Sequence, residues 1–203
     1  MTRQTRTRRS DLFDAPGGAR RDAPRLPEGF RYETELISPR DEGALVARVR
    51  ELPFREFEFH GYTGRRRVVS FGWRYDFTGR GLQKADAIPD YLLPLREIAA
   101  SFAGVGAEEF AHALVTEYAR EAGIGWHRDK AVFGETVGVS LLSPCLFRMR
   151  RAVGGRRWER ANLILEPRSA YLLSGAARGE WEHSIPGADA LRYSITFRTL
   201  RSG

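Results

Sequence analysis

Two side chains able to bind a metal stand two residues apart in the middle of this chain, His127 and Asp129. In an extended segment, residues two apart point to the same side, so this imidazole and this carboxylate can reach one point in space. They are two of the three ligands in the two-His-one-carboxylate site of non-haem Fe(II) proteins. Far along the chain, His183 offers the missing imidazole. The sequence therefore predicts one metal site, shared by His127, Asp129 and His183, with coordination positions left open.

A second pattern begins nine residues after His183, in the segment 192–198. Its even positions are polar and its odd positions apolar, which is typical of a strand with two unlike faces. The polar face carries two arginines, a serine and a threonine: Arg192, Ser194, Thr196 and Arg198. Burying an arginine without a counter-anion is costly, and a carboxylate can accept two of its hydrogen bonds. This face therefore predicts a pocket for a small dianion.

Together these motifs resemble the AlkB-type Fe(II)/2-oxoglutarate dioxygenases, and the resemblance covers residues 54 to 198. It includes Tyr118 nine residues before His127, the segments 143–144 and 147–150, and the run 175–178 that leads to His183. The resemblance implies that His127, Asp129 and His183 are the catalytic metal ligands. It also implies Fe(II) as the metal, 2-oxoglutarate as co-substrate and O2 as oxidant.

The resemblance further assigns the co-substrate pocket. Arg192 is similar to the arginine that binds the remote carboxylate of 2-oxoglutarate, and Arg198 to the one near its metal-binding end. Six residues of strand span roughly 20 Å, so both guanidinium groups must lean inward to reach one diacid. Tyr118 and Ser194 are expected to donate hydrogen bonds to it. Thr116 stands where many relatives have Asn, which puts its contact in doubt, and Ser194 is a milder departure of the same kind.

The aromatic segment 71–79 matches the lid that covers the substrate in AlkB-like enzymes. Trp73, Tyr75 and Phe77 are the candidate substrate contacts, because every base offers a π-face on which a ring can stack. A competing interpretation is that these three rings, spaced by two, form one buried face of a strand. The resemblance implies oxidation of a C–H bond, and an N-methyl group oxidised in this way leaves as formaldehyde. The expected activity is demethylation of N-alkylated bases in single-stranded DNA or RNA, as in alkylation damage repair.

The formal net charge of +7 is concentrated in arginine clusters. Residues 1–27 contain seven arginines against three aspartates, residues 65–67 are all arginine, and residues 148–160 contain six arginines. Clusters of this kind suit a polyanion such as nucleic acid. The alternative interpretation is an ordinary solvated surface.

Composition limits the remaining possibilities. A chain of 203 residues is long enough for one domain with a full core, and no apolar run approaches membrane-spanning length. The basic N-terminus lacks the apolar stretch of a secretory signal. The single cysteine, Cys145, excludes an internal disulfide and favours a small buried residue in a reducing cytoplasm. We expect a cytoplasmic monomer with a disordered basic tail at 1–27 and one dioxygenase domain at 28–203.

The elements that must position these residues are mostly strands. Ser38 followed by Pro39 predicts the start of a helix, and residues 94–101 predict a second helix that stops at Gly104. Strands are expected at 54–59 and 67–71, joined by a turn at Gly61 and Gly64. Eight more strands are then predicted, at 113–118, 125–129, 136–142, 146–151, 157–165, 169–173, 183–185 and 191–199. The expected class is mainly β with flanking helices (α+β), arranged as a double-stranded β-helix or jelly roll.

Two other functions fit part of the same pattern. One is dioxygenase chemistry on a protein side chain or a small molecule, which fold and metal site cannot distinguish from base demethylation. The other is a noncatalytic metal-binding jelly roll, or a zinc hydrolase with the same three ligands. The pair of arginines argues against a hydrolase, because hydrolysis needs no diacid co-substrate.

Overall fold

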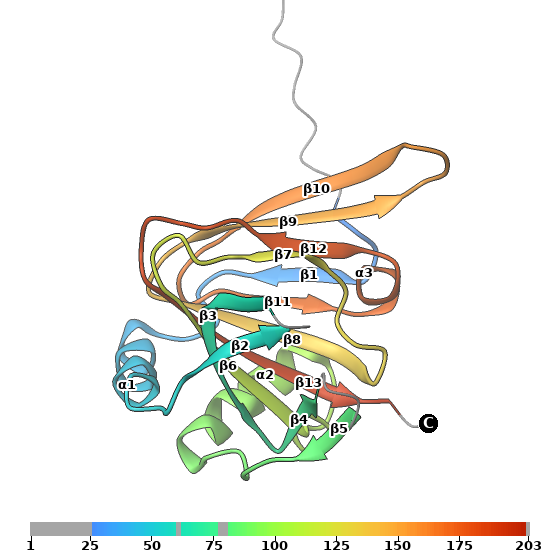
Figure 1. Cartoon of the computed structure of the whole chain (residues 1–203). Helices are drawn as coiled ribbons and strands as arrows, with labels where there is room; N and C mark the ends of the chain where they lie inside the picture. Colours follow the sequence, from blue (N-terminus) through green and yellow to red (C-terminus); the bar gives the residue numbers. More distant parts are fainter. Residues whose placement is uncertain (1–25, 60–61, 77–80, 202–203) are drawn as a thin grey trace, which may run out of the picture.

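A computed structural model of the chain describes residues 26–59, 62–76 and 81–201, and Figure 1 shows two sheets stacked face to face. The larger sheet has seven strands, in the order β1 (Phe30–Glu33), β11 (Ala170–Leu173), β8 (Phe133–Leu141), β13 (Arg192–Leu200), β6 (His112–Tyr118), β3 (Tyr62–Phe71) and β2 (Arg55–Phe59). The smaller sheet has four, in the order β10 (Trp158–Leu165), β9 (Cys145–Ala152), β12 (Glu182–Ile185) and β7 (Ile124–His127). The predicted jelly roll is confirmed.

A separate pair of strands, β4 (Trp73–Asp76) and β5 (Gly81–Lys84), follows β3 directly. Gly72 makes the bend between β3 and β4 with a φ of 71°, where a side chain would meet the backbone oxygen of Ala111 at 2.0 Å. Only glycine tolerates both the positive φ and this close approach. Within the predicted aromatic segment, residues 73–76 therefore form a short strand turned away from the main sheet.

The two predicted helices pack on the larger sheet. In α1 (Pro39–Val49), the hydroxyl of Ser38 accepts a hydrogen bond from the backbone N–H of Asp41 at 3.2 Å. This bond satisfies one of the free donors at the helix start. In α2 (Leu93–Ala103), the chain leaves the helix at Gly104 with a φ of 78°. Both end signals in the sequence are confirmed. Single 3₁₀ turns, η1 (Asp90–Leu92) and η2 (Ala107–Glu109), flank α2.

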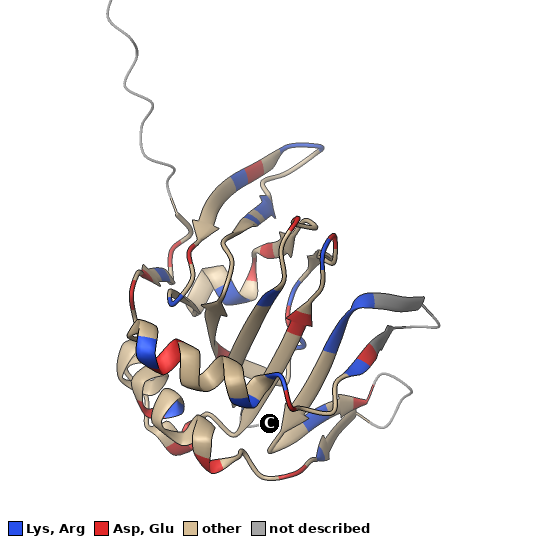
Figure 2. Ribbon diagram, turned by 90° about the vertical axis from the view of Figure 1, so that its left-hand side faces the viewer, with Lys and Arg blue, Asp and Glu red and all other residues tan. Residues whose placement is uncertain are grey.

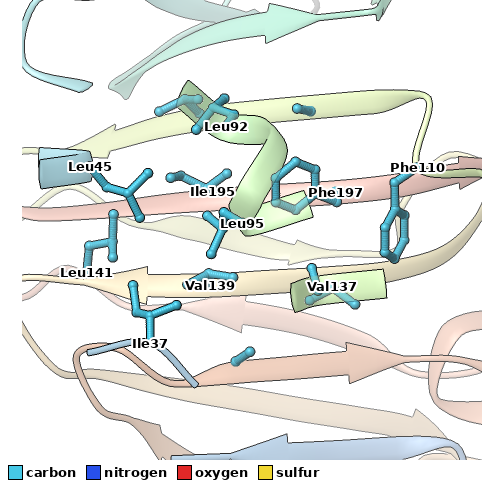
Figure 3. Close-up of a cluster of buried hydrophobic side chains, with 14 of the residues drawn as sticks. Ile37, Leu45, Leu92, Leu95, Phe110, Val137, Val139, Leu141, Ile195 and Phe197 are labelled. Atoms are coloured by element: carbon cyan, nitrogen blue, oxygen red, sulfur yellow. The ribbon is translucent and has the colours of Figure 1, made fainter. Parts of the chain in front are cut away.

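The alternation predicted for β13 divides the molecule into two layers of core. Tyr193, Ile195 and Phe197 face the helices, where Figure 3 shows Ile195 and Phe197 packed among Leu92, Leu95, Val137 and Val139. The opposite face of the same strand carries polar side chains that are also buried. The helices therefore supply the apolar packing on one side, and the polar side is left to form a site between the sheets.

A second apolar cluster fills part of the space between the two sheets. It contains Phe147, Met149, Leu165, Tyr171, Trp181 and the predicted buried cysteine, Cys145. These side chains come from both sheets, so they fix the distance between the two inner faces.

No helix of the described residues is long and apolar enough to cross a membrane.

Several sequence-based boundaries were wrong. Gly64 lies inside β3 and not in a turn, because β2 and β3 continue pairing past it, with Phe57 opposite Gly64. Strand β7 ends at His127, so Asp129 lies beyond the extended segment from which its position was predicted. The strands β1 and β5 and the five-residue helix α3 (Gly175–Gly179) are too short for their periodicity to be recognised. Residues 1–25 of the predicted tail lie outside the described residues.

Candidate metal centre and anion pocket

Three side chains that can bind a metal converge between the sheets. The ligand atoms of His127, Asp129 and His183 all lie within 4.8 Å of one another. The two histidines are direct partners in the antiparallel pairing of β7 with β12, and their ring centroids are 4.2 Å apart. Asp129 approaches from the loop that follows β7. Strand pairing therefore places the two imidazoles, and the loop brings in the carboxylate.

Both histidines are held in the neutral form that binds metal. Burial lowers the pKa of His183 to about 3, and burial also lowers the pKa of His127. The Nδ1 atom of His127 lies 2.9 Å from the backbone oxygen of Gly125. A proton on Nδ1 would make this hydrogen bond and leave Nε2 as the metal-binding atom. The ring of His183 stacks on Phe147 at 5.4 Å.

The carboxylate of Asp129 is fixed by two neighbours. Arg198 donates from Nε to Oδ2 at 3.1 Å and from Nη2 to Oδ1 at 3.2 Å, and Thr136 donates its hydroxyl to Oδ2 at 3.2 Å. Burial alone would raise the pKa of Asp129, but the charge and hydrogen bonds of Arg198 outweigh burial and hold that pKa well below its usual range. The group is therefore an ionised and oriented carboxylate. Arg198 lies at the metal end of the pocket, as the family resemblance implies.

Arg192 is the other charged group on the polar face of β13, and it is 3% exposed. Its Nε donates to the hydroxyl of Ser140 at 3.0 Å, and its Cζ lies 5.0 Å from the centre of the Tyr118 ring. Its Nη1 is buried without a hydrogen-bond partner, and no ion pair joins Arg192 to a carboxylate of the described residues. A buried guanidinium in this state is costly. A bound carboxylate would supply both the acceptor and the negative charge.

The other predicted co-substrate residues lie on the strand next to β13. Thr116 is opposite Ser194, and Tyr118 is opposite Arg192, in the register of β6 with β13. Thr116 and Ser194 are both buried. Strand pairing thus brings together all five side chains for which the sequence predicts a co-substrate role, with Arg192 and Arg198 at the two ends. The polar lining fits a small diacid, and its contacts with that diacid remain a prediction.

Sequence reasoning missed three residues that belong to this pocket, Thr136, Ser140 and Tyr171. Thr136, Gly138 and Ser140 are spaced by two along β8 and therefore share one face of the strand. This is the same period-two pattern that identified the polar face of β13. A Cβ atom on Gly138 would lie 2.4 Å from the Tyr171 ring, so the absence of a side chain at Gly138 leaves room for that ring to lie over β8. Burial raises the pKa of Tyr171, which keeps its phenol a hydrogen-bond donor. Arg192, Arg198 and Asp129 all act electrostatically on it.

A buried arginine also holds the loop after Asp129 in place. Arg178 donates hydrogen bonds to the backbone oxygens of Lys130, Phe133 and Gly134, at 2.7, 2.6 and 3.0 Å. Lys130 lies in the loop between Asp129 and β8, and Phe133 and Gly134 are the first two residues of β8. Arg178 is therefore a structural support for the position of Asp129 and is not itself a ligand.

The three aromatic residues predicted to contact substrate are placed differently. The ammonium of Lys130 lies 5.1 Å from the centre of the Tyr75 ring, which puts Tyr75 beside the loop that carries Asp129. Trp73 is at the other end of β4, with the Lys84 ammonium 4.3 Å from its ring centre. Phe77 lies outside the described residues. Of the two that are described, Tyr75 is the one beside the loop that carries Asp129.

Several arginines of the clusters form ion pairs within the described part of the protein. Arg65 and Arg67 form ion pairs with Glu121 and Glu117, at 3.7 and 2.6 Å. The same holds for Arg150 with Glu182, and for Arg151 with Glu159 and Glu180. Figure 2 accordingly shows blue and red segments side by side on neighbouring strands. The clusters predicted from sequence are therefore not uniform phosphate-binding surfaces.

Comparison with known proteins supports one family. The model of the 2OG-Fe(II) oxygenase superfamily matches residues 30–198. The chain is 34% identical over 164 residues to "Alpha-ketoglutarate-dependent dioxygenase alkB homolog 7, mitochondrial" of Bos taurus, covering 79% of this chain and 69% of the relative.

Two solved structures share the fold at low sequence identity. One is described as "The structure of OsALKBH1": it has a TM-score of 0.63 and 14% identity, over 86% of this chain and 100% of that chain. The other is a prolyl-4-hydroxylase of Pseudomonas putida, with a TM-score of 0.57 and 15% identity, over 85% of this chain and 93% of that chain. These two likenesses concern the fold alone.

Proposed function

This chain belongs to the 2OG-Fe(II) oxygenase superfamily and is an AlkB-type dioxygenase, and we propose that it demethylates N-alkylated bases in single-stranded DNA or RNA. The family uses Fe(II), 2-oxoglutarate and O2. In the proposal, His127, Asp129 and His183 hold the iron, and Arg192 receives the remote carboxylate of 2-oxoglutarate. Once bound, the iron and its co-substrates supply the oxidation of a C–H bond.

The protein's own residues prepare this chemistry before any ligand arrives. Arg198 and Thr136 hold Asp129 ionised and oriented, so little reorganisation is needed when a metal binds. Burial keeps the two imidazoles neutral. The apolar cluster between the sheets, which includes Phe147 beside His183, keeps water away from that end of the site.

The observation that carries the co-substrate assignment is the unpartnered Nη1 of Arg192. Its Nε is already fixed by Ser140, so the guanidinium has a set orientation with Nη1 left for a ligand. A buried guanidinium with an unpartnered N–H group binds a carboxylate in preference to a neutral group, because the carboxylate supplies both an acceptor and a negative charge. A site that only bound metal would have no use for this arginine, which disfavours a noncatalytic metal-binding protein.

The choice of a base as substrate rests on Tyr75 and on the family. An aromatic ring beside the metal-binding loop can stack on a planar base, and stacking contributes roughly 1–3 kcal/mol per base. A target base must leave its stack to reach a metal between two sheets, and this costs least in a single strand. These considerations favour a base in single-stranded nucleic acid.

A second candidate substrate is a protein side chain or a small molecule. The ion pairs of Arg67, Arg150 and Arg151 favour it, because they remove much of the positive charge that would otherwise attract phosphates. The metal centre and the Arg192 pocket would be the same for either substrate. Substrate identity must therefore be tested separately from co-substrate use.

The test is a panel of single-stranded DNA and RNA oligonucleotides with N-methylated bases, each paired with its unmethylated counterpart. Formaldehyde and succinate are measured together, with His183→Gln as the inactive control. The proposal expects formaldehyde from at least one methylated oligonucleotide, in step with succinate above the unmethylated background. Consumption of 2-oxoglutarate with no formaldehyde from any member would assign the substrate to the second class.

A further inference from the structure

The hairpin of β9 and β10 exposes an unusual amount of apolar surface. Five large hydrophobic side chains of the described residues are exposed, and four belong to this hairpin: Leu146 (36%), Val153 (44%), Trp158 (38%) and Ile164 (46%). Strand β10 is the edge of the smaller sheet, and Figure 1 shows the hairpin tip extending away from the body of the molecule. Apolar side chains gathered in this way on an edge hairpin mark an interaction surface.

The outward face of the same sheet carries stacked arginine and tryptophan side chains. Phe147 and Met149 point into the core, so Arg148 and Arg150 point outward. The Cζ atom of Arg150 lies 4.3 Å from the ring centres of both Trp126 and Trp158, and that of Arg148 lies 5.1 Å from Trp126. We call this surface the outer platform, made of Trp126, Leu146, Arg148, Arg150, Trp158, Arg160 and Ile164.

Positive charge exceeds negative charge on the outer platform. Arg150 is paired with Glu182 at 2.7 Å. Arg148 donates to the hydroxyl of Ser184 at 3.0 Å, and neither Arg148 nor Arg160 forms an ion pair with a carboxylate of the described residues. Arg160 is opposite Arg150 in the strand register. A second copy of the chain seated here would bring arginines against arginines, so the platform suits an anionic partner.

The outer platform is continuous with the strand that carries a metal ligand. Trp126 and Arg128 are the chain neighbours of His127, and alternate residues of a strand face opposite sides. A hollow of about 340 Å³ at this end is lined by Arg128, Arg150 and Trp158, with Arg151, Ala152, Gly179, Glu180 and Glu182 completing its wall. A partner lying on the platform would therefore lie across the smaller sheet from the metal centre, with only the strand β7 between Trp126 and the site.

We propose that the outer platform docks single-stranded nucleic acid on the outer face of the smaller sheet, whose inner face carries His127 and His183, an inference that rests on the proposed function. Bases stack on the exposed face of Trp158 and pack on Leu146 and Ile164, and phosphates approach Arg148 and Arg160. Planar rings and planar guanidinium groups alternate here, which favours a chain of flat aromatic groups with anionic links over an acidic peptide. The platform would anchor the strand on this outer face while a base elsewhere along the strand enters the metal centre.

The test is binding of an unmodified, fluorescein-labelled single-stranded oligonucleotide, followed by anisotropy at several salt concentrations with Mn(II) and 2-oxoglutarate bound to the enzyme. Trp158→Ala is expected to weaken binding about five-fold or more, because a base can no longer stack on the indole ring. Arg160→Glu is expected to weaken binding and to reduce the slope of log affinity against log salt by about 0.7 for each phosphate that the variant no longer neutralises. The control is Arg40→Glu, the same charge change at the exposed start of α1.

Two results would overturn the proposal. One is an affinity and salt slope for Arg160→Glu that match those of Arg40→Glu. The other is a loss of polyglutamate binding or of self-association in the platform variants while oligonucleotide binding is unchanged, which would assign the surface to an acidic protein or to a second copy. Arg160→Glu decides the matter alone if Trp158→Ala fails to fold. Because the probe carries no methyl group, this test succeeds or fails independently of demethylation.

Discussion

Arg198 and Asp129 meet in a two-point salt bridge, with Nε 3.1 Å from Oδ2 and Nη2 3.2 Å from Oδ1. Arg192, on the same face of the same strand, has a buried Nη1 with no partner. One arginine is therefore satisfied by the protein, and the other is left for a ligand. This difference means that the same substitution at the two positions should have opposite consequences.

Arg198→Met should destabilise the metal-free protein by about 3–5 kcal/mol, because it leaves the Asp129 carboxylate buried without its partner. A bound Mn(II) should restore part of the loss by supplying positive charge at the same carboxylate. Denaturant unfolding with and without Mn(II) measures both effects. Arg67→Met is the control: Arg67 is half-exposed, so its pair with Glu117 should be worth less than about 1 kcal/mol. Equal losses in the two variants would contradict this role of Arg198.

Arg192→Met should leave the metal-free protein as stable as the wild type or more so, since it removes a buried charge that lacks a counter-ion. It should also abolish the stabilisation by 2-oxoglutarate in the presence of Mn(II), about 2.7 kcal/mol in the wild type at 100 times the dissociation constant. Arg192→Lys should recover only part, because a point charge does not reproduce the planar fork. An unchanged 2-oxoglutarate effect in Arg192→Met would place the diacid elsewhere.

Thr136→Val should lower metal affinity about 10–100-fold, because it removes a hydrogen bond that orients the Asp129 ligand. Thr136→Ser keeps the hydroxyl and should stay near the wild type. Anaerobic titration of the metal-free proteins with Fe(II) compares the three. Equal affinities for the valine and serine variants would show that the hydroxyl does not position the ligand.

His112 gives the protein an acid-sensitive stability term. Burial lowers its pKa from 6.5 to about 3, so between these values the unfolded chain binds a proton that the folded chain does not. The stability that neutral His112 contributes should therefore be complete above pH 6.5 and fall on acidification, by at most about 1.36 kcal/mol per pH unit for this one group. His112→Gln removes this dependence. Its free energy of unfolding, measured with a chelator between pH 5 and 7, should fall less steeply than that of the wild type. Parallel curves would mean that His112 does not titrate in this way.

The polar face of β13 was predicted from sequence because a strand that lies between a helical layer and a polar site must alternate apolar and polar residues. The helices were predicted from their end signals at Ser38, Pro39 and Gly104, which act locally. The metal ligands were predicted from residue type and spacing, although Asp129 lies past the end of its strand. Features that depend on neighbours in the chain were therefore within reach of sequence reasoning.

Features that depend on strand register were not. Arg67 was counted in an arginine cluster suited to a polyanion, but strand pairing places it opposite Glu117, fifty positions away. Tyr171 reaches the pocket only because Gly138 on the neighbouring strand leaves room for its ring. The outer platform combines residues from three strands of the smaller sheet. Each of these relationships joins segments that no local pattern connects.

The central claim is that His127, Asp129 and His183 hold the one iron that oxidises substrate with 2-oxoglutarate. Its most direct test measures bound iron per chain and succinate formed from 2-oxoglutarate in the wild type, in His183→Gln and in the distant control Arg40→Glu. We predict one equivalent of iron and succinate formation in the wild type and the control, and loss of both in His183→Gln. Full iron content with wild-type succinate formation in His183→Gln would contradict the assignment.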